Sequence, residues 1–65
     1  MQSLNQIIAE SVEKKDIKTL ESLESDISLV IEFTRSRVVH LAFYKQAVYN
    51  RLLIQHAILK VLWNQ

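Results

Sequence analysis

Residues 36–64 constrain the fold of this chain more than any other segment, because they are apolar on two sides of one helix. The segment contains no glycine, no proline and no acidic residue. Its apolar residues form two stripes, each with the three-and-four spacing of a helical face. A helix with two apolar sides must be covered on both. The first stripe comprises Val38, Leu41, Val48, Leu52, Leu59 and Trp63, and the second comprises Val39, Phe43, Ala47, Ile54, Ala57 and Val61.

The length of the chain predicts that this coverage needs a second copy. A chain of 65 residues forms at most one domain, residues 1–65, and buries only about 60% of its unfolded surface. Small domains usually add disulfides, a metal or oligomerisation. The sequence has no cysteine and only two histidines, which leaves no disulfide and no closed zinc site. We therefore expect a homodimer.

Residues 3–24 also have helical spacing. Ser3 followed by Gln6 fits a capping box that begins a helix. Asp16 is a second candidate N-cap, after a break in the apolar spacing. The sequence leaves open whether this segment is one bent helix or two short ones.

Residues 27–33 have two readings. As a strand, Ile27, Leu29, Ile31 and Phe33 alternate with polar positions, and the β-branched and aromatic content favours this reading. As a helix, Leu29 and Phe33 would lie among charged side chains. A single strand would have to pair with the same strand of another copy. We expect the strand, and the helix is the alternative.

The predicted fold is therefore mainly α, with helices at about 3–24 and 36–64, a short strand at about 27–33, and an intertwined homodimer. The alternative is an all-α helical hairpin that dimerises. The predicted dimer interface consists of Ile27, Leu29, Ile31, Phe33, Val38, Leu41, Val48, Leu52, Leu59 and Trp63. The predicted groove for a partner helix consists of Phe43, Ala47, Ile54, Ala57 and Val61.

Charge is distributed unevenly along the chain. Residues 1–34 hold seven acids and three lysines, a net charge of −4, whereas residues 35–65 hold five cations and no acid. This asymmetry predicts that the acidic part packs on the basic part, within one chain or across a dimer. Arg35 and Arg37 are the candidate nucleic-acid contacts, but the cations form no cluster. Nucleic acid is therefore not an expected partner.

No catalytic, cofactor-binding or metal-binding motif is present. The carboxylate pairs Glu10/Glu13 and Glu21/Glu24 lie on charged helical surfaces, and a glycine-free chain cannot build a phosphate-binding loop. The longest uncharged run of the apolar segment is too short for a membrane span, and the N-terminal residues do not resemble a signal peptide. We expect a cytoplasmic protein that is not an enzyme, without cofactors and without a membrane span.

The predicted order of helix (3–24), strand (27–33) and long apolar helix (36–64) resembles a group of small phage proteins. These are the early pro-lytic proteins encoded between the exonuclease and excisionase genes of lambda-like temperate phages. The resemblance implies a dimeric phage protein that acts in the host cytoplasm and promotes lytic development by binding a host factor. It assigns no role to any single residue.

The expected function is regulation through protein–protein contact, with a homodimer that offers its groove to a partner protein. One alternative is a DNA-binding transcriptional regulator that uses Arg35, Arg37, Lys45 and Arg51. Another is an antitoxin or inhibitor subunit.

Overall fold

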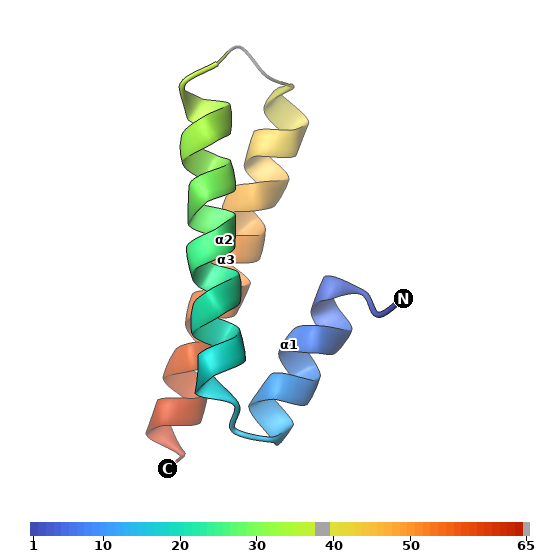
Figure 1. The fold of residues 1–65 in the computed structure, drawn as a ribbon, viewed down its shortest axis with the longest axis vertical. Coiled ribbons are helices and arrows are strands. Elements are labelled where there is room, and N and C mark those ends of the chain that lie inside the picture. Colours follow the sequence, from blue (N-terminus) through green and yellow to red (C-terminus); the bar gives the residue numbers. More distant parts are fainter. Residues whose placement is uncertain (38–39, 65) are drawn as a thin grey trace.

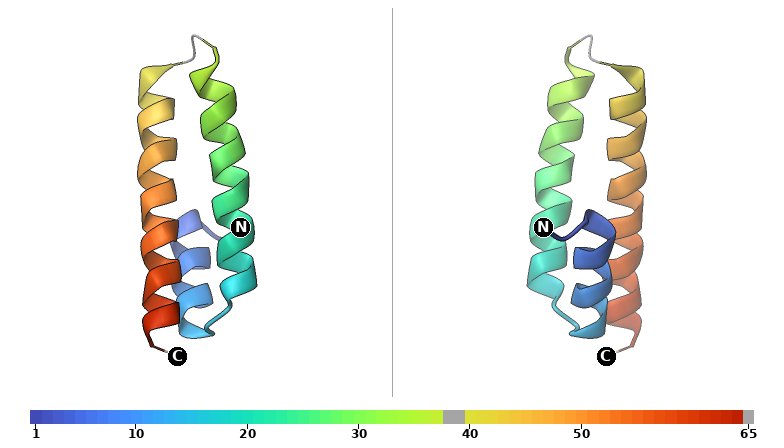
Figure 2. Two further views of the ribbon diagram at one scale, coloured as in Figure 1. Left: turned by 90° about the vertical axis from the view of Figure 1, so that its left-hand side faces the viewer. Right: turned by 90° about the vertical axis from the view of Figure 1, so that its right-hand side faces the viewer.

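The described part of the chain folds into three helices (Figure 1). A computed structural model describes residues 1–37 and 40–64, and they form α1 (Leu4–Glu13), α2 (Ile17–Arg35) and α3 (Leu41–Trp63). Helices α2 and α3 form a long antiparallel hairpin. The shorter α1 lies against the end of the hairpin that holds the start of α2 and the end of α3 (Figure 2). The prediction of a mainly α fold is confirmed.

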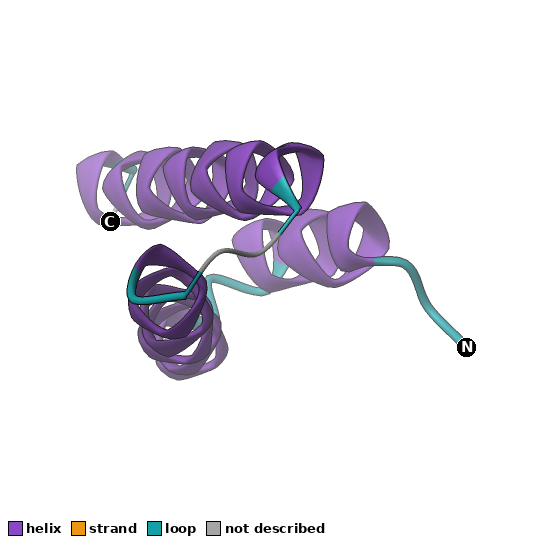
Figure 3. Ribbon diagram, turned by 90° about the horizontal axis from the view of Figure 1, so that it is seen from above, coloured by secondary structure: helices purple, strands orange, loops and turns teal. Residues whose placement is uncertain are grey.

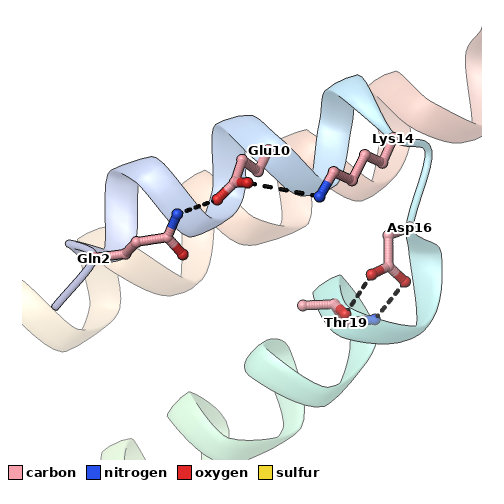
Figure 4. A network of polar contacts seen from close by, with 5 residues as sticks. All are labelled: Gln2, Glu10, Lys14, Asp16 and Thr19. Carbon is pink, nitrogen blue, oxygen red and sulfur yellow. Dashed lines mark hydrogen bonds and ion pairs between the residues drawn. The ribbon is translucent and has the colours of Figure 1, made fainter.

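Helix α1 begins at the predicted capping box. The Ser3 hydroxyl accepts a hydrogen bond from the Gln6 backbone N–H (3.2 Å), and the Gln6 side chain accepts one from the Ser3 N–H (2.8 Å). These two bonds satisfy donors that the first turn of a helix otherwise leaves free. On the same helix, Glu10 forms an ion pair with Lys14 (3.6 Å) and accepts a hydrogen bond from Gln2 (Figure 4).

Residues 3–24 are two helices rather than one, and the break lies at the predicted second N-cap. Lys15 has a φ of 54°, a left-handed conformation that ends α1. The next residue, Asp16, then caps α2 by accepting hydrogen bonds from the Thr19 backbone N–H (3.2 Å) and hydroxyl (2.6 Å; Figure 4). This cap starts the second helix in a new direction.

The predicted strand at 27–33 is wrong, because these residues lie inside α2. A helix satisfies its backbone hydrogen bonds locally, whereas a single strand needs a partner strand. Ile31 is buried on the inner side of α2 and Ile27 is half-buried, while Leu29 and Phe33 are exposed. One copy therefore has the all-α hairpin of the alternative prediction.

The predicted start of the long helix at residue 36 is also wrong. Ser36 instead ends α2, where its N–H donates to Glu32 O (3.2 Å) and its hydroxyl donates to Phe33 O (3.0 Å). Helix α3 has His40 as its N-cap residue, without a side-chain hydrogen bond. Val38 and Val39, which belong to the predicted stripes, lie outside the described residues.

The core lies where the three helices meet. Leu20 of α2 is completely buried against Ala57 and Val61 of α3. The small side chain of Ala57 allows the helices to approach closely. The half-buried side chains that pack around this cluster come from all three helices: Ile8, Val12, Ile17 and Ile58.

Candidate interaction surface on helix α3

The second stripe of α3, predicted as an open groove, is largely buried inside the chain. Ala47, Ile54, Ala57 and Val61 are buried, and only Phe43 remains exposed. Ile8 and Val12 of α1 pack against the cluster that contains Ala57 and Val61. The prediction is therefore corrected for these four residues: α2 packs along this stripe, with Leu20 against Ala57 and Val61, and α1 fills the lower part of the groove.

The upper part of this groove, beyond α1, remains open beside Phe43. Side chains of α2 and α3 border a small pocket there, with a volume of about 100 Å³. Its lining is apolar on the α2 side and mixed on the α3 side: Ile27, Val30, Phe43, Gln46, Ala47 and Asn50.

The first stripe of α3 faces solvent along the whole helix. Seen along the hairpin, α1 and α2 both lie on one side of α3, and the opposite side has no neighbour (Figure 3). Val48 is half-buried. The other described members have large exposed fractions: Leu41 63%, Leu52 55%, Leu59 65% and Trp63 88%. We call these five residues the outer stripe.

The outer stripe has the spacing of a coiled-coil seam. Two polar residues, Lys45 and Gln55, occupy seam positions between its members. The intervals then alternate between four and three residues, which keeps a seam facing a second helix. In order, the seam positions are Leu41, Lys45, Val48, Leu52, Gln55 and Leu59.

Sequence reasoning missed two exposed side chains that widen this surface, Tyr49 (57%) and Leu62 (52%). Leu62 lies seven residues after Gln55, so a strict heptad count would have found it. Tyr49 lies beside the seam rather than on it. Both extend the apolar area next to the outer stripe.

The total exposed area of the chain is large for its mass. The solvent-accessible surface is 5138 Å², whereas a folded monomer of 7.6 kDa is expected to expose about 4300 Å². The excess of roughly 800 Å² matches the share of one partner in a standard protein–protein interface. The elongated shape of the chain, with extents of 41 × 23 × 14 Å, contributes to this excess.

The charge asymmetry predicted that the acidic residues 1–34 pack on the basic residues 35–65, within one chain or across a dimer. Within one chain, the described residues of these two parts form no ion pair with each other. Within residues 1–37 and 40–64, the one ion pair joins Lys14 to Glu10 at the end of α1. The polar contact across the hairpin is a hydrogen bond from Gln55 Nε2 to Glu24 Oε1 (3.2 Å). Among the described residues, no ion pair joins α2 to α3.

An acidic cleft borders the outer stripe near its C-terminal end. It lies between α2 and α3, has a volume of about 480 Å³, and is lined by Glu21, Glu24, Gln55, Ile58 and Leu59. Glu24 Oε1 accepts hydrogen bonds from Gln55 and from the Ser28 hydroxyl (3.1 Å). These bonds hold the carboxylate at the edge of the stripe.

The two predicted nucleic-acid contacts, Arg35 and Arg37, line one open pocket at the end of α2, together with Thr34, Leu41 and Tyr44, whereas Lys45 and Arg51 lie elsewhere on α3. Arg35 is exposed at the end of α2, and the Arg37 guanidinium lies 4.3 Å from the centre of the Phe33 ring. Arg51 is half-buried, and its Nε is buried without a hydrogen-bond partner among the described residues. Lys45 projects from the outer stripe, on another side of α3 from Arg51.

The Asp16 carboxyl at the start of α2 has a lowered pKa. Hydrogen bonds from the Thr19 hydroxyl, and then from the Thr19 backbone N–H, lower the pKa of the Asp16 carboxyl. Asp16 is a helix cap, and this structural role explains the shift. His40 and His56 are exposed, and no group of three or more metal-ligating side chains occurs among the residues that the structure describes.

No helix in the described ranges combines the length and the apolarity that crossing a membrane requires.

Comparison with known proteins finds no matching protein family, and neither the curated proteins nor the solved structures contain a match to this chain. The outer stripe is thus the candidate site that the geometry offers.

Proposed function

We propose that this protein is not an enzyme and acts through protein–protein contact, as a homodimer joined by the outer stripe of α3. The observation that carries the proposal is the exposure of Leu41, Leu52, Leu59 and Trp63 in one straight row. Monomeric proteins rarely expose a row of large apolar side chains of this length, here interrupted only by Lys45 and Gln55, and such surfaces usually bind other proteins.

A second helix is the partner that fits this surface best. The 23 residues of α3 extend over about 34 Å at 1.5 Å per residue. Seam spacing allows each apolar side chain to insert between four side chains of a facing helix. A loop or a flat sheet would leave much of such a row exposed.

The dimer would act as a regulator by holding a further partner. The resemblance to early phage proteins suggests a host factor and a role in lytic development. Part of that resemblance is the predicted strand at 27–33, which is helical in the structure. A pull-down from host extract with the tagged chain tests this part of the proposal, because it predicts one dominant stoichiometric partner. The pocket beside Phe43 is the place we propose for that contact, so Phe43→Asp should remove the partner.

The dimer is tested by two matched substitutions, Leu59→Lys and Leu29→Lys. Both leucines are 65% exposed and both lie inside helices, but Leu29 is on α2, away from the outer stripe. We expect sedimentation equilibrium to show a dimer for the parent chain and for Leu29→Lys, and a monomer for Leu59→Lys. A charged residue in the seam would have to be desolvated in the dimer.

A parent chain that remains monomeric at high micromolar concentration would refute the homodimer. Equal dissociation of both variants would show that the interface is not the outer stripe. Circular dichroism of each variant serves as the control that the helices are still formed.

A further inference from the structure

We propose that the two copies pack with their α3 helices antiparallel, with Leu52 at the two-fold axis and Lys45 of each copy in the acidic cleft of the other. This inference rests on the proposed homodimer and specifies its geometry. It follows from the position of the outer stripe, the position of the acidic cleft and the charges that have no partner inside one copy.

The register follows from the length of the stripe. The outer stripe runs from Leu41 to Trp63, and Leu52 lies at its midpoint. Two antiparallel stripes overlap along their full length only when their midpoints coincide, and this register sets Val48 opposite the partner's His56. Leu41 then lies opposite the partner's Trp63, and Lys45 lies opposite the partner's Leu59.

The charges agree with this register. Leu59 lines the cleft that also contains the carboxylates of Glu21 and Glu24. Lys45 is exposed and has no ion-pair partner in the described part of its own chain. In the antiparallel dimer its ammonium group reaches the partner's cleft, and the symmetry repeats this contact. Two polar seam residues thereby find partners: Lys45 pairs with acids of the other copy, while Gln55 stays bonded to Glu24 of its own copy.

The parallel arrangement lacks this complementarity. In a parallel dimer in register, Lys45 lies against the partner's Lys45, and like charges at a seam destabilise an interface. The two α3 macrodipoles would also point in the same direction, whereas antiparallel packing places opposite ends together. The described part of α3 carries no acidic residue that would relieve the repulsion.

Single cysteines test the orientation, because the natural chain has none. We expect Leu41→Cys mixed with Trp63→Cys to give a disulfide between the two variants in a glutathione redox buffer. Each variant alone should give little disulfide. Leu29→Cys, on the outer side of α2, is the matched control and should also give little.

A homodisulfide of Leu41→Cys, without a mixed product, would overturn the antiparallel arrangement. Sedimentation of the variants under reducing conditions separates this failure from that of the proposed function. If the reduced variants are dimers, but the redox buffer gives the homodisulfide of Leu41→Cys, only the orientation is refuted. A reduced parent chain that is monomeric refutes both.

A charge exchange tests the contact between Lys45 and the cleft. We expect Lys45→Glu to raise the dissociation constant of the dimer by about 10-fold or more, since it brings a third carboxylate to the partner's Glu21 and Glu24. Adding Glu24→Lys to the same chain should restore most of the affinity. Lys14→Glu changes the net charge equally, but Lys14 is exposed at the end of α1, which lies on the other side of α3 from the outer stripe (Figure 3), so it should leave the dimer unchanged. Equal effects of Lys45→Glu and Lys14→Glu, or no recovery in the double variant, would overturn the contact.

Discussion

Replacing Leu20 by alanine should destabilise the protein far more than the same replacement of Leu29. Both leucines lie in α2, so the change in helix propensity is similar. Leu20 has an exposed fraction of 0% and packs at the junction of the three helices, whereas Leu29 is 65% exposed. The comparison therefore isolates the contribution of the core.

The expected loss for Leu20→Ala is about 3–5 kcal/mol, because the cavity is walled by three helices and cannot collapse fully. The expected change for Leu29→Ala is within about 0.5 kcal/mol, as for other surface substitutions. A domain of 65 residues has a free energy of unfolding of about 3–10 kcal/mol in total. Leu20→Ala should therefore leave the chain close to unfolding.

Urea unfolding followed by circular dichroism measures both changes. With an m-value of about 1 kcal/mol per M, a loss of 3 kcal/mol lowers the midpoint by roughly 3 M. Each variant is measured at two protein concentrations, because a dimer adds a concentration-dependent stability. Equal losses, or a larger loss for Leu29→Ala, would refute the helical packing of α2 and would agree with the strand arrangement instead.

Two further predictions concern the helix caps. Ser3→Ala removes the capping box and should lower the free energy of unfolding by about 1 kcal/mol. Hydrogen-exchange NMR should show that amide protection is lost in α1 and kept in α2 and α3. An even loss of protection over all three helices would contradict the role of Ser3. The lowered pKa of Asp16 means that its cap stabilises the fold fully above the unfolded-state pKa and loses this effect as the pH falls through the folded-state pKa. Thr19→Val removes the hydroxyl donor, so the Asp16 pKa, followed through its carboxyl carbon, should rise towards its usual range. An unchanged pKa would assign the shift to another cause.

The short α1 leaves part of the hairpin uncovered. It covers one end of the α2–α3 groove and leaves the pocket beside Phe43 open. Within the described residues, no helix covers the opposite side of α3 (Figure 3). A second copy on the outer stripe would enlarge the apolar core beyond what 65 residues can build alone.

Local features of the sequence were sufficient to predict the N-caps of α1 and α2 and the apolar character of the last helix, but not where that helix begins. Ser3 with Gln6, and Asp16 with the residues that follow it, act within one turn, so their hydrogen bonds depend on no distant segment. The two apolar stripes of α3 are likewise visible from spacing alone. Each of these features is read over distances of three to seven residues.

Tertiary packing decided which stripe is inside and whether 27–33 is a strand or a helix. Both stripes of α3 are apolar, but the second contains Ala47 and Ala57, whose small side chains allow α2 and α1 to approach closely. The first stripe carries larger side chains and remains on the outside. The alternating pattern at 27–33 fits a strand. In the structure these residues belong to α2, which buries Ile31 in the hairpin and needs no partner strand. Such choices depend on which surfaces meet, and residues far apart in the sequence determine that.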